Sequence, residues 1–181
     1  MLNPQNSIVV MLEALPISGD IAAGSSLQRV ISCAEALSIP IFCASYRLDK
    51  LEKTIRAEAP SSIGYPSFPF EPEVDEWQTT VLAQAIAATG RRQLLICGRW
   101  LKEGITLLAH QAMRIGLDAY VCIDISLPLQ QDHLTTLQLR LVQHNIVVTT
   151  TEQAVREWIA LSPSEKRQLT LPFLKIAPER S

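Results

Sequence analysis

Short apolar runs alternate with longer amphipathic stretches along most of the chain. The first run, at residues 8–12, is rich in β-branched side chains and is typical of a buried strand. Runs of the same kind predict four further strands, at residues 39–44, 94–97, 119–123 and 146–149. Pro40 lies near the start of its strand, where the missing backbone donor is tolerated. The pattern therefore predicts five strands.

The stretches between these runs have apolar residues at helical spacing. Helices are predicted over residues 25–37, 75–89, 101–115, 132–144 and 151–161. A last short helix is expected after a capping box at residues 162–165, with Pro163 at the first helical position. Helices thus separate most of the predicted strands.

Residues 46–73 break this alternation. Prolines stand at positions 60, 66, 69 and 72, which precludes a long helix. We predict a long connection here, and connections of this length inside a compact domain are usually functional or without fixed structure. Its aromatic side chains indicate that it packs onto another part of the protein.

Strands that alternate with amphipathic helices predict an α/β fold, with a parallel sheet and helices on both of its faces. Ligands bind such sheets at the carboxyl ends of the strands. The residues to inspect are therefore those that end or follow the predicted strands, at 12–13, 46–47, 98–104 and 124–126. We expect one domain over residues 1–162, followed by a short helix and tail over residues 163–181.

Composition narrows the class of protein. The chain has 181 residues, 16 of them basic and 18 acidic, which gives a formal net charge of −2. This near-zero charge argues against a nucleic-acid partner. No apolar run approaches the roughly 20 residues that span a bilayer, and the N-terminus lacks the pattern of a secretion signal. We predict a soluble cytoplasmic protein with no membrane partner.

Cysteine and histidine give little sign of a metal or redox site. The cysteines are Cys33, Cys43, Cys97 and Cys122. None forms a C-x-x-C pair, and each is expected to be a buried, reduced side chain. The three histidines show no ligand spacing, and the glycine-rich nucleotide motifs and the G-x-S-x-G elbow are missing. We therefore expect neither a metal nor a cofactor.

The most unusual strand-to-helix turn is Gly-Arg-Trp-Leu-Lys-Glu-Gly, at residues 98–104. A helix that begins here would offer free backbone N–H groups to an anion. Arg99 and Lys102 would assist such binding. The same features also fit an ordinary solvated turn, and both interpretations stay open at this point.

The residues around this turn resemble isochorismatase-like cysteine hydrolases. Residues 87–98, Ala-Ala-Thr-Gly-Arg-Arg-Gln-Leu-Leu-Ile-Cys-Gly, are similar to the segment that precedes the nucleophile in that family. The similarity continues through the next helix and through the strand that ends at Asp124. Trp77 resembles an aromatic that is common in one bacterial branch. The resemblance runs from about residue 7 to 160 and is best over 74–126.

The resemblance implies a three-layer, Rossmann-like fold with a mostly parallel sheet of five or six strands. It also implies an Asp-Lys-Cys triad. In the family, the Asp ends the first strand and activates the thiol, the Lys helps to stabilise charge, and the Cys lies at the start of a helix, where a thiolate is favoured. Family members usually form symmetric oligomers, so a homo-oligomer is expected here, and a small-molecule ligand is a further expected partner.

All three triad positions are replaced in this chain. The Asp position holds Leu12, or Glu13 if the alignment shifts by one residue. The Lys position falls at Phe70 or Glu71. Aligned on the family motif Gly-x-x-Thr-x-x-Cys, the Cys position holds Gly104. Since loss of the nucleophile alone removes most of the rate of a covalent mechanism, the family's chemistry does not carry over.

Our leading hypothesis is a catalytically inactive protein of this fold that works as a binding or assembly subunit. The candidates for its pocket are Glu13, Trp77, Arg99, Trp100, Leu101 and Lys102. Trp77, Trp100 and the connection at 46–73 are also candidates for an interface, although ordinary packing would equally explain them.

Two alternatives belong to other classes. One is a hydrolase that acts on C–N or related bonds through a rebuilt site, in which Glu13 works with Arg99, Lys102 or Glu103. A pocket filled by Leu12, Leu101 and Phe70 would argue against it. The other alternative is a small-molecule or anion binder at the start of the helix at residues 99–104. Cys97 as a substitute nucleophile has little support, because a strand interior rarely activates a thiol.

Overall fold

The structure is a computed structural model that describes residues 1–12, 21–46, 64–71, 75–99, 101–127 and 134–174. Its strands are β1 (Ser7–Leu12), β2 (Ile41–Tyr46), β3 (Ser67–Phe70), β4 (Gln93–Arg99), β5 (Asp118–Leu127) and β6 (Val147–Thr149). Its α-helices are α1 (Ile21–Ala36), α2 (Val81–Ala88), α3 (Thr106–Arg114), α4 (Leu134–Gln143), α5 (Thr151–Ala160) and α6 (Ser164–Thr170). Short 3₁₀-helices cover Trp77–Thr79 (η1) and Leu171–Leu174 (η4), and a π-helix, η2, covers Leu101–Ile105.

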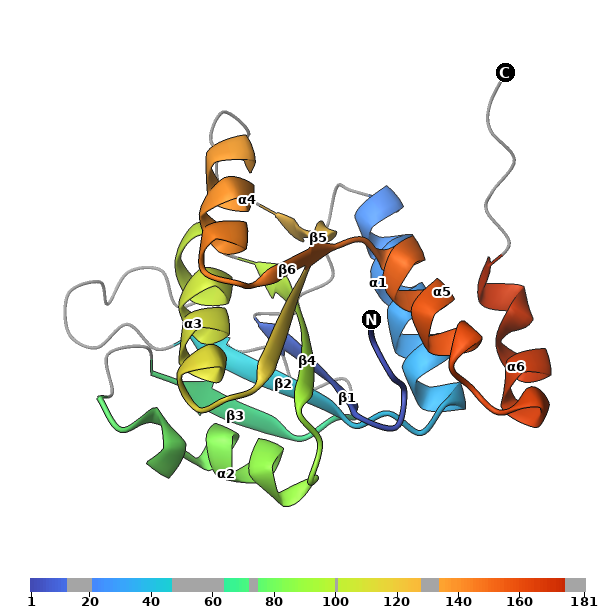
Figure 1. The fold of residues 1–181 in the computed structure, drawn as a ribbon, viewed down its shortest axis with the longest axis horizontal. Coiled ribbons are helices and arrows are strands. Elements are labelled where there is room, and N and C mark those ends of the chain that lie inside the picture. Colours follow the sequence, from blue (N-terminus) through green and yellow to red (C-terminus); the bar gives the residue numbers. More distant parts are fainter. Residues whose placement is uncertain (13–20, 47–63, 72–74, 100, 128–133, 175–181) are drawn as a thin grey trace.

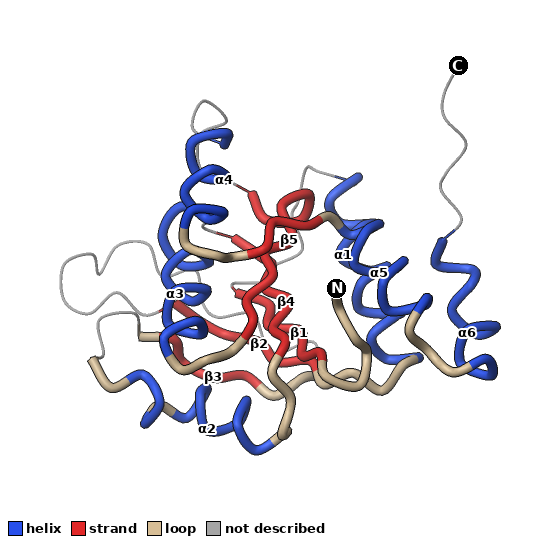
Figure 2. The backbone as a smooth tube through the Cα atoms, viewed as in Figure 1, coloured by secondary structure: helices blue, strands red, loops and turns tan. Residues whose placement is uncertain are grey.

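The six strands form one parallel sheet in the order β3-β2-β1-β4-β5-β6. Helices cover both of its faces, as Figures 1 and 2 show. This arrangement confirms the predicted three-layer α/β fold. β1 lies at the centre, and the chain extends the sheet first to one side of β1 and then to the other.

Strand alternation divides the core into two layers. The first, the α2/α3/α4 layer, packs residues such as Leu94 and Ile96 of β4 against helices α2, α3 and α4. The second, the α1/α5 layer, packs Leu95 and Cys97 of the same strand against α1 and α5. Helix α6 lies beyond this second layer, near α1 and α5. Both faces of the sheet are therefore closed by apolar packing.

Some element boundaries differ from the prediction. β3 lies inside the stretch predicted as a connection, and it carries Pro69 at the edge of the sheet, where proline is tolerated. Helix α1 begins four residues before the predicted start at residue 25. The predicted helix over 75–89 is a 3₁₀ turn followed by the shorter α2. β5 continues to Leu127, four residues past its predicted end.

The predicted capping box before α6 is wrong. The Ser162 hydroxyl donates a hydrogen bond to the Trp158 carbonyl oxygen at 2.7 Å, and therefore does not cap the helix. Pro163 is the N-cap residue, and it has no side-chain cap bond. A serine that can reach the last turn of the preceding helix satisfies that carbonyl instead.

No helix among the described residues has the length and the apolar character needed to cross a membrane.

Candidate functional site

The strand order places the candidate site at the carboxyl ends of β1 and β4. The chain leaves β1 toward β2 on one side, whereas β4 lies against β1 on the other side, and ligands bind α/β sheets at such a switch point. Leu12, the last residue of β1, is in register with Ala44 of β2 and with Gly98 of β4. The register therefore places Leu12 directly beside Gly98, where the turn begins.

Gly98 is required by the close approach of these two strands. Its φ is +126°, a conformation that other residues rarely adopt. A Cβ atom at this position would lie 1.9 Å from the Leu12 carbonyl oxygen, which is far inside van der Waals contact. Only glycine fits, and the start of the turn is thereby held directly against the end of β1.

The turn leads into the π-helix η2 and then into α3. The Thr106 hydroxyl donates to the Leu101 carbonyl oxygen, five residues earlier, at 2.5 Å, and both residues are buried. Gly104, at the family's cysteine position, lies inside this wider π-helical turn and is buried as well. π-Helical turns often occur at functional sites in proteins. The backbone geometry is therefore that of a specialised turn, with glycine at the position that the resemblance aligns with the family's cysteine.

The residues that the resemblance aligns with the other two triad positions are part of the apolar core. Leu12 and Phe70 are 0% and 1% exposed and belong to the α2/α3/α4 layer. Leu101 and Ile105 of η2 are fully buried in the same layer. Carboxylate and ammonium groups at the first two positions would need polar partners, which aliphatic and aromatic side chains do not supply. These residues bury apolar surface at positions that the resemblance aligns with the family's triad.

Two buried side-chain polar atoms of the described residues have no hydrogen-bond partner. They are Trp77 Nε1 and Ser126 Oγ. Trp77 belongs to the same apolar layer as Leu12 and Phe70. Ser126, on strand β5, is in register with Gly98 on the neighbouring strand β4. A buried unpaired group of this kind costs about 1–3 kcal/mol.

The four thiols all pack in the α1/α5 layer, on the opposite face of the sheet from Leu12 and Phe70. Cys33, Cys97 and Cys122 are buried there, and the half-buried Cys43 packs against them. Burial raises the pKa of Cys33 to about 12. Burial also raises the pKa of Cys97 to about 12, with smaller contributions from Asp124 and Cys43. A thiol with a raised pKa is a poor nucleophile at neutral pH.

Burial also raises the pKa of the remaining two thiols, Cys43 and Cys122. Burial is also the main cause of the strongly raised pKa of Cys122, to which Asp124 and Cys97 add, while a hydrogen bond with Thr151 acts in the opposite direction. No thiol of the chain therefore has the lowered pKa of a reactive cysteine.

Asp124, the acidic residue at the end of the resembling segment, is a capping residue. Its carboxylate accepts a hydrogen bond from the Thr151 backbone N–H at 2.9 Å and another from Cys122 Sγ at 3.2 Å. A carboxylate at the N-terminus of helix α5 also interacts favourably with the helix dipole. Asp124 thus holds α5 against β5 on the face that carries the thiols.

Two histidines that are far apart in sequence meet on the surface. The rings of His110 on α3 and His144 after α4 lie edge to face, with centroids 4.4 Å apart. Burial lowers the pKa of His110, and His144 and Arg140 lower it further. Within the described ranges, no group of three or more His, Cys, Asp or Glu side chains is placed to hold a metal ion.

The structure brings some of the sequence-predicted site residues together and leaves others outside its description. Leu12, Phe70, Trp77 and Leu101 lie in one apolar layer. Glu13 and Trp100 fall outside the described residues, as do the side chains of Arg99, Lys102 and Glu103.

Sequence reasoning included Ser126 among the residues to inspect, but it placed Ser126 after a strand that was predicted to end at residue 123, and did not predict a buried, unpaired hydroxyl within β5. It also missed the π-helical form of the turn. A serine directly after an apolar strand end was the only available signal for the first, and we find no sequence signal for the second.

No family model and no curated protein matches the chain. Solved structures do match it. YcaC from Escherichia coli, described as an octameric hydrolase of unknown specificity, aligns with a TM-score of 0.71 and 18% identity over 96% of this chain and 88% of YcaC. MAR1 ribonuclease from Caenorhabditis elegans aligns with a TM-score of 0.73 and 16% identity, over 98% of this chain and 94% of MAR1.

A third match is an isochorismatase from Pseudomonas putida KT2440. Its TM-score is 0.62 and its identity 14%, over 83% of this chain and 90% of that protein. At identities this low the matches report on the fold. Together with the six-stranded parallel sheet, they show that the chain has the isochorismatase-like fold that its sequence resembles.

Proposed function

We propose that this chain has lost the cysteine-hydrolase reaction of its fold relatives and works as a binding or assembly subunit. The observation that carries the proposal is the apolar character of the triad positions. Leu12 and Phe70 are fully buried, and Gly104 has no side chain. Covalent hydrolysis needs a nucleophile and a base within hydrogen-bond reach of each other, and these three residues supply neither.

The placement of the thiols supports the same conclusion. A substitute nucleophile would have to reach the carboxyl ends of β1 and β4 from the α2/α3/α4 side. Cys97 is next to Gly98 in sequence, yet it points into the opposite layer and its pKa is raised. For Cys97 to act, β4 would have to rotate its side chain through the sheet, which strand alternation forbids.

The packing also bears on the rebuilt-site alternative. A pocket filled by Leu12, Leu101 and Phe70 leaves no room for a new hydrolytic site among these side chains. All three are fully buried in one apolar layer. A rebuilt site that used Glu13 or the charged side chains of the 98–104 turn would have to lie outside this layer.

Assembly is the second part of the proposal. YcaC from E. coli, which aligns along 88% of its length, is described as octameric. A protein whose site residues have become core residues can still be retained for the surfaces that it offers to copies of itself or to other partners. The ribonuclease activity named for MAR1 is not proposed here, since a formal net charge of −2 does not favour nucleic acid.

Thiol labelling and a substrate panel test the proposal. We expect native protein treated with acrylamide at pH 7.5 to gain almost no mass, apart from slow modification at the half-buried Cys43. Unfolded protein should gain four adducts, one for each cysteine. A Cys43→Ser variant is the matched control, since its native state should be inert. Fast labelling at a single buried position would contradict the proposal.

The panel should contain amides, carbamoyl compounds and esters of small molecules. We expect no turnover above that of a heat-treated sample. Turnover that is lost in Glu13→Gln, but kept in a Glu165→Gln control on helix α6, would establish a rebuilt hydrolytic site and overturn the inactive assignment.

A further inference from the structure

Two histidines from different helices face each other where α3 and the end of α4 come together. His110 lies in α3 and His144 directly follows α4, and their rings meet edge to face with centroids 4.4 Å apart. Arg140, one turn before His144 on α4, also acts on the His110 ring. One permanent positive charge and two groups that can become positive therefore lie at this contact.

The groups that act on the charge of His110 are both basic. His144 and Arg140 each lower its pKa, in addition to the larger effect of burial. Helix α3 adds Arg114, one turn after His110, whose guanidinium donates to Gln111 at 3.3 Å. No acidic side chain of the described residues is among the groups that act on the ring.

The neighbouring strands supply no counter-charge either. β6, which follows the histidine pair, is Val-Val-Thr. On β5, Asp118 acts on Tyr120 of the α1/α5 layer, and Asp124 accepts a hydrogen bond from the Thr151 backbone N–H at the start of α5. Both carboxylates therefore serve the opposite face of the sheet. Positive charge on the imidazoles would meet Arg140 without a carboxylate of the described residues to balance it.

Helix α4 is attached to the protein through two buried apolar side chains, Leu137 and Leu141, which belong to the α2/α3/α4 layer. Leu139 and Val142 are exposed. Arg140 is the one charged residue in α4, so the helix has no ion pair of its own. β6, the next element, is the last strand of the sheet. α4 can therefore part from α3 without opening a strand pair inside the sheet.

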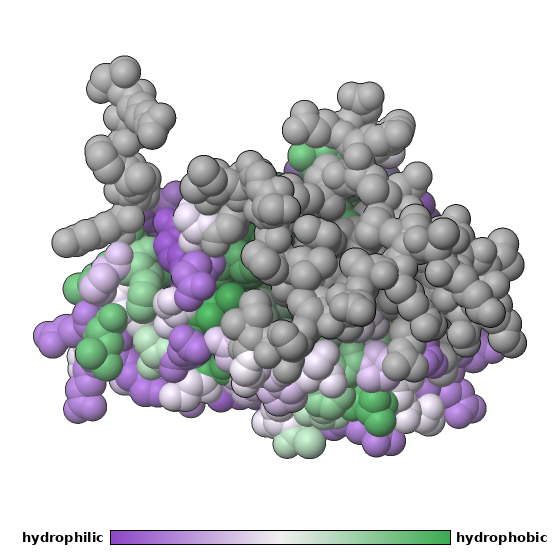
Figure 3. Space-filling view, turned by 180° about the vertical axis from the view of Figure 1, so that it is seen from behind, coloured by the Kyte–Doolittle hydropathy of each residue, from purple (hydrophilic) through white to green (hydrophobic). Residues whose placement is uncertain are grey.

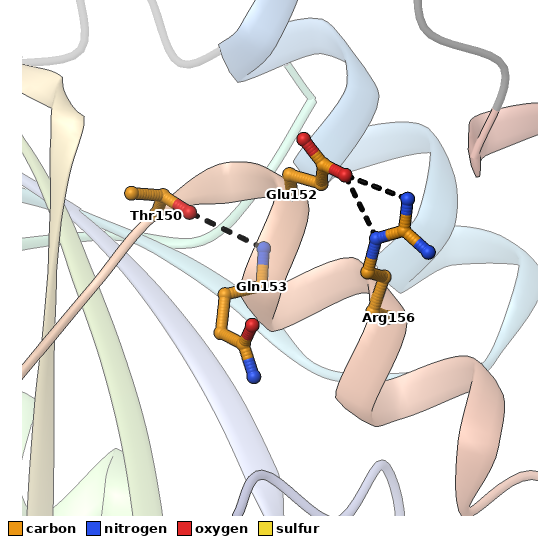
Figure 4. A network of polar contacts seen from close by, with 4 residues as sticks. All are labelled: Thr150, Glu152, Gln153 and Arg156. Atoms are coloured by element: carbon orange, nitrogen blue, oxygen red, sulfur yellow. Dashed lines mark hydrogen bonds and ion pairs between the residues drawn. The ribbon is translucent and has the colours of Figure 1, made fainter.

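Helix α5 has the same length, ten residues, but it is stabilised by polar contacts. The Thr150 hydroxyl accepts a hydrogen bond from the Gln153 backbone N–H at 3.3 Å, which caps the first turn. Arg156 forms an ion pair with Glu152 at 2.7 Å, as Figure 4 shows. α5 is therefore a suitable internal reference for α4.

Polar contacts also join α5 and α6 to the rest of the protein. Glu157 accepts a hydrogen bond from the Leu2 backbone N–H at 2.7 Å, and Trp158 Nε1 donates to Ser7 Oγ at 2.9 Å. Lys166 of α6 donates to the carbonyl that follows α1 at 3.4 Å. Figure 3 shows hydrophobic and hydrophilic residues intermixed on the side of the molecule where α6 lies. These two helices are held by more than apolar burial.

We propose that the contact between His110 and His144 is an acid-sensitive latch, and that protonation of the two imidazoles beside Arg140 releases α4 from α3 while the sheet and α5 stay folded. Histidine is the side chain whose charge ordinarily changes between pH 5 and 8. Two neutral rings pack well at 4.4 Å, whereas two imidazolium groups at that distance repel each other and Arg140. The latch does not depend on whether the chain assembles or has lost hydrolysis.

The sign of the pH effect follows from proton linkage. In the closed arrangement, burial and the two basic neighbours lower the pKa of His110. Release returns the ring to water and separates it from His144 and Arg140, so the released arrangement binds the proton more readily. The closed arrangement should therefore lose stability relative to the released one as the pH falls below about 6.5. Leu137 and Leu141 would then leave the apolar layer.

The test is hydrogen exchange of the full chain, followed by mass spectrometry at pH 7.5 and pH 5.5. Labelling times are scaled to the intrinsic exchange rate at each pH. Peptides from α4 report on the latch, and peptides from α5 are the internal reference. We expect α4 to lose protection by about 10-fold at pH 5.5, the change that one unit of altered proton affinity produces, while α5 keeps its protection.

Histidine variants identify the groups responsible. His110→Gln/His144→Gln should leave α4 equally protected at both pH values, and Arg140→Gln should show a smaller pH effect than the wild type. His133→Gln removes the third histidine and is the matched control, which should respond to pH as the wild type does. Circular dichroism at both pH values checks folding. If the double variant does not fold, His144→Gln alone, at an exposed position, replaces it.

Three results would overturn the latch. The first is equal protection of wild-type α4 at the two pH values. The second is a loss of protection that α4 and α5 share, because it would report unfolding of the whole domain. The third is a pH effect that survives in the double histidine variant or disappears in His133→Gln.

Discussion

The two faces of the sheet differ in the groups that they hold. The α2/α3/α4 face packs against the turn that begins at Gly98, which is pressed against Leu12 and is followed by a π-helix. On this face, Leu12 and Phe70, which the resemblance aligns with two triad positions, are apolar and buried. The α1/α5 face holds all four thiols and the Asp124 carboxylate, which are the groups that chemistry would need. The comparison teaches that the four thiols and Asp124 serve packing and helix capping on the face opposite the turn.

The strongest test of this contrast is Leu12→Asp. We expect it to lower the free energy of unfolding by about 4–6 kcal/mol at pH 7, because leucine packing is lost and a carboxylate is buried without a partner. Urea denaturation measures the effect. Leu169→Asp at an exposed position is the control and should change stability little.

The pH dependence of the same variant provides an independent check. Burial would raise the pKa of the introduced carboxyl above its unfolded value of about 4, so the folded state would bind the proton more tightly. The penalty should therefore shrink as the pH falls toward 4, whereas Leu12→Asn should show no such trend. A loss below about 1 kcal/mol for Leu12→Asp at pH 7 would mean that a polar site does exist at the end of β1.

Gly98→Ala should be the next most damaging change, at about 3–5 kcal/mol, because strain at positive φ adds to a collision with the Leu12 backbone. Gly90→Ala is the matched control. Gly90 also has a positive φ, of 68°, but no atom lies within 4 Å of the added Cβ. Gly90→Ala should therefore show the backbone strain alone, and equal losses in the two variants would refute the close approach of β1 and β4.

On the opposite face, Asp124→Ala should cost about 1–2 kcal/mol, since it leaves the buried Thr151 N–H without an acceptor. Asp124→Asn keeps an acceptor and should retain much of the stability. Thermal unfolding followed by circular dichroism distinguishes the two variants. If they lose the same amount, the charge of Asp124 matters more than its hydrogen bond.

Ser126→Ala should stabilise the protein by up to about 1 kcal/mol, because it removes a buried hydroxyl that has no partner. Ser162→Ala is the contrasting control, since the Ser162 hydroxyl donates to Trp158 and its loss should destabilise. A destabilising Ser126→Ala would indicate that a water molecule or a ligand pairs with this hydroxyl.

The smallest expected effect concerns pH. The pKa of His110 is lowered by burial and by His144 and Arg140, so the unfolded state binds the proton more readily than the folded state. Stability should therefore fall as the pH drops below about 6.5. His110→Gln should flatten this part of the stability curve and leave the value at pH 8 almost unchanged. Curves of equal slope for the two proteins would mean that His110 does not contribute.

The sequence predicted the fold well where the signal was strong. The apolar runs that became β1, β4 and β5 have no competing interpretation, and their order implied a parallel sheet. β3 was missed because Pro69 and its proline-rich surroundings favour a connection, while pairing with β2 decides in favour of a strand. The start of α1 was placed too late because its first residues, Ile-Ala-Ala-Gly, include small side chains that leave the apolar periodicity weak.

For the candidate site, the assignment of the triad positions stays a prediction. Alignment on Gly98 gave Leu101 and Gly104, because a glycine motif is local in sequence, whereas Leu12 was assigned from the end of the first strand and Phe70 from the mid-chain connection. The unpaired state of Ser126 and of Trp77 depends on what surrounds each side chain in three dimensions, which no local pattern contains. The π-helical turn was equally hidden, since its apolar spacing is similar to that of an α-helix.

The burial of Leu12 and Phe70 has an evolutionary consequence. If the proposed loss of hydrolysis holds, restoring the triad would require at least three substitutions, and the two that introduce charged groups would each weaken the fold before any activity rewarded them. Intermediates on that route would be less stable and still inactive. Under the proposed loss of the triad, leucine and phenylalanine at these positions would act as a ratchet, and later selection would act on what the scaffold offers from its outside.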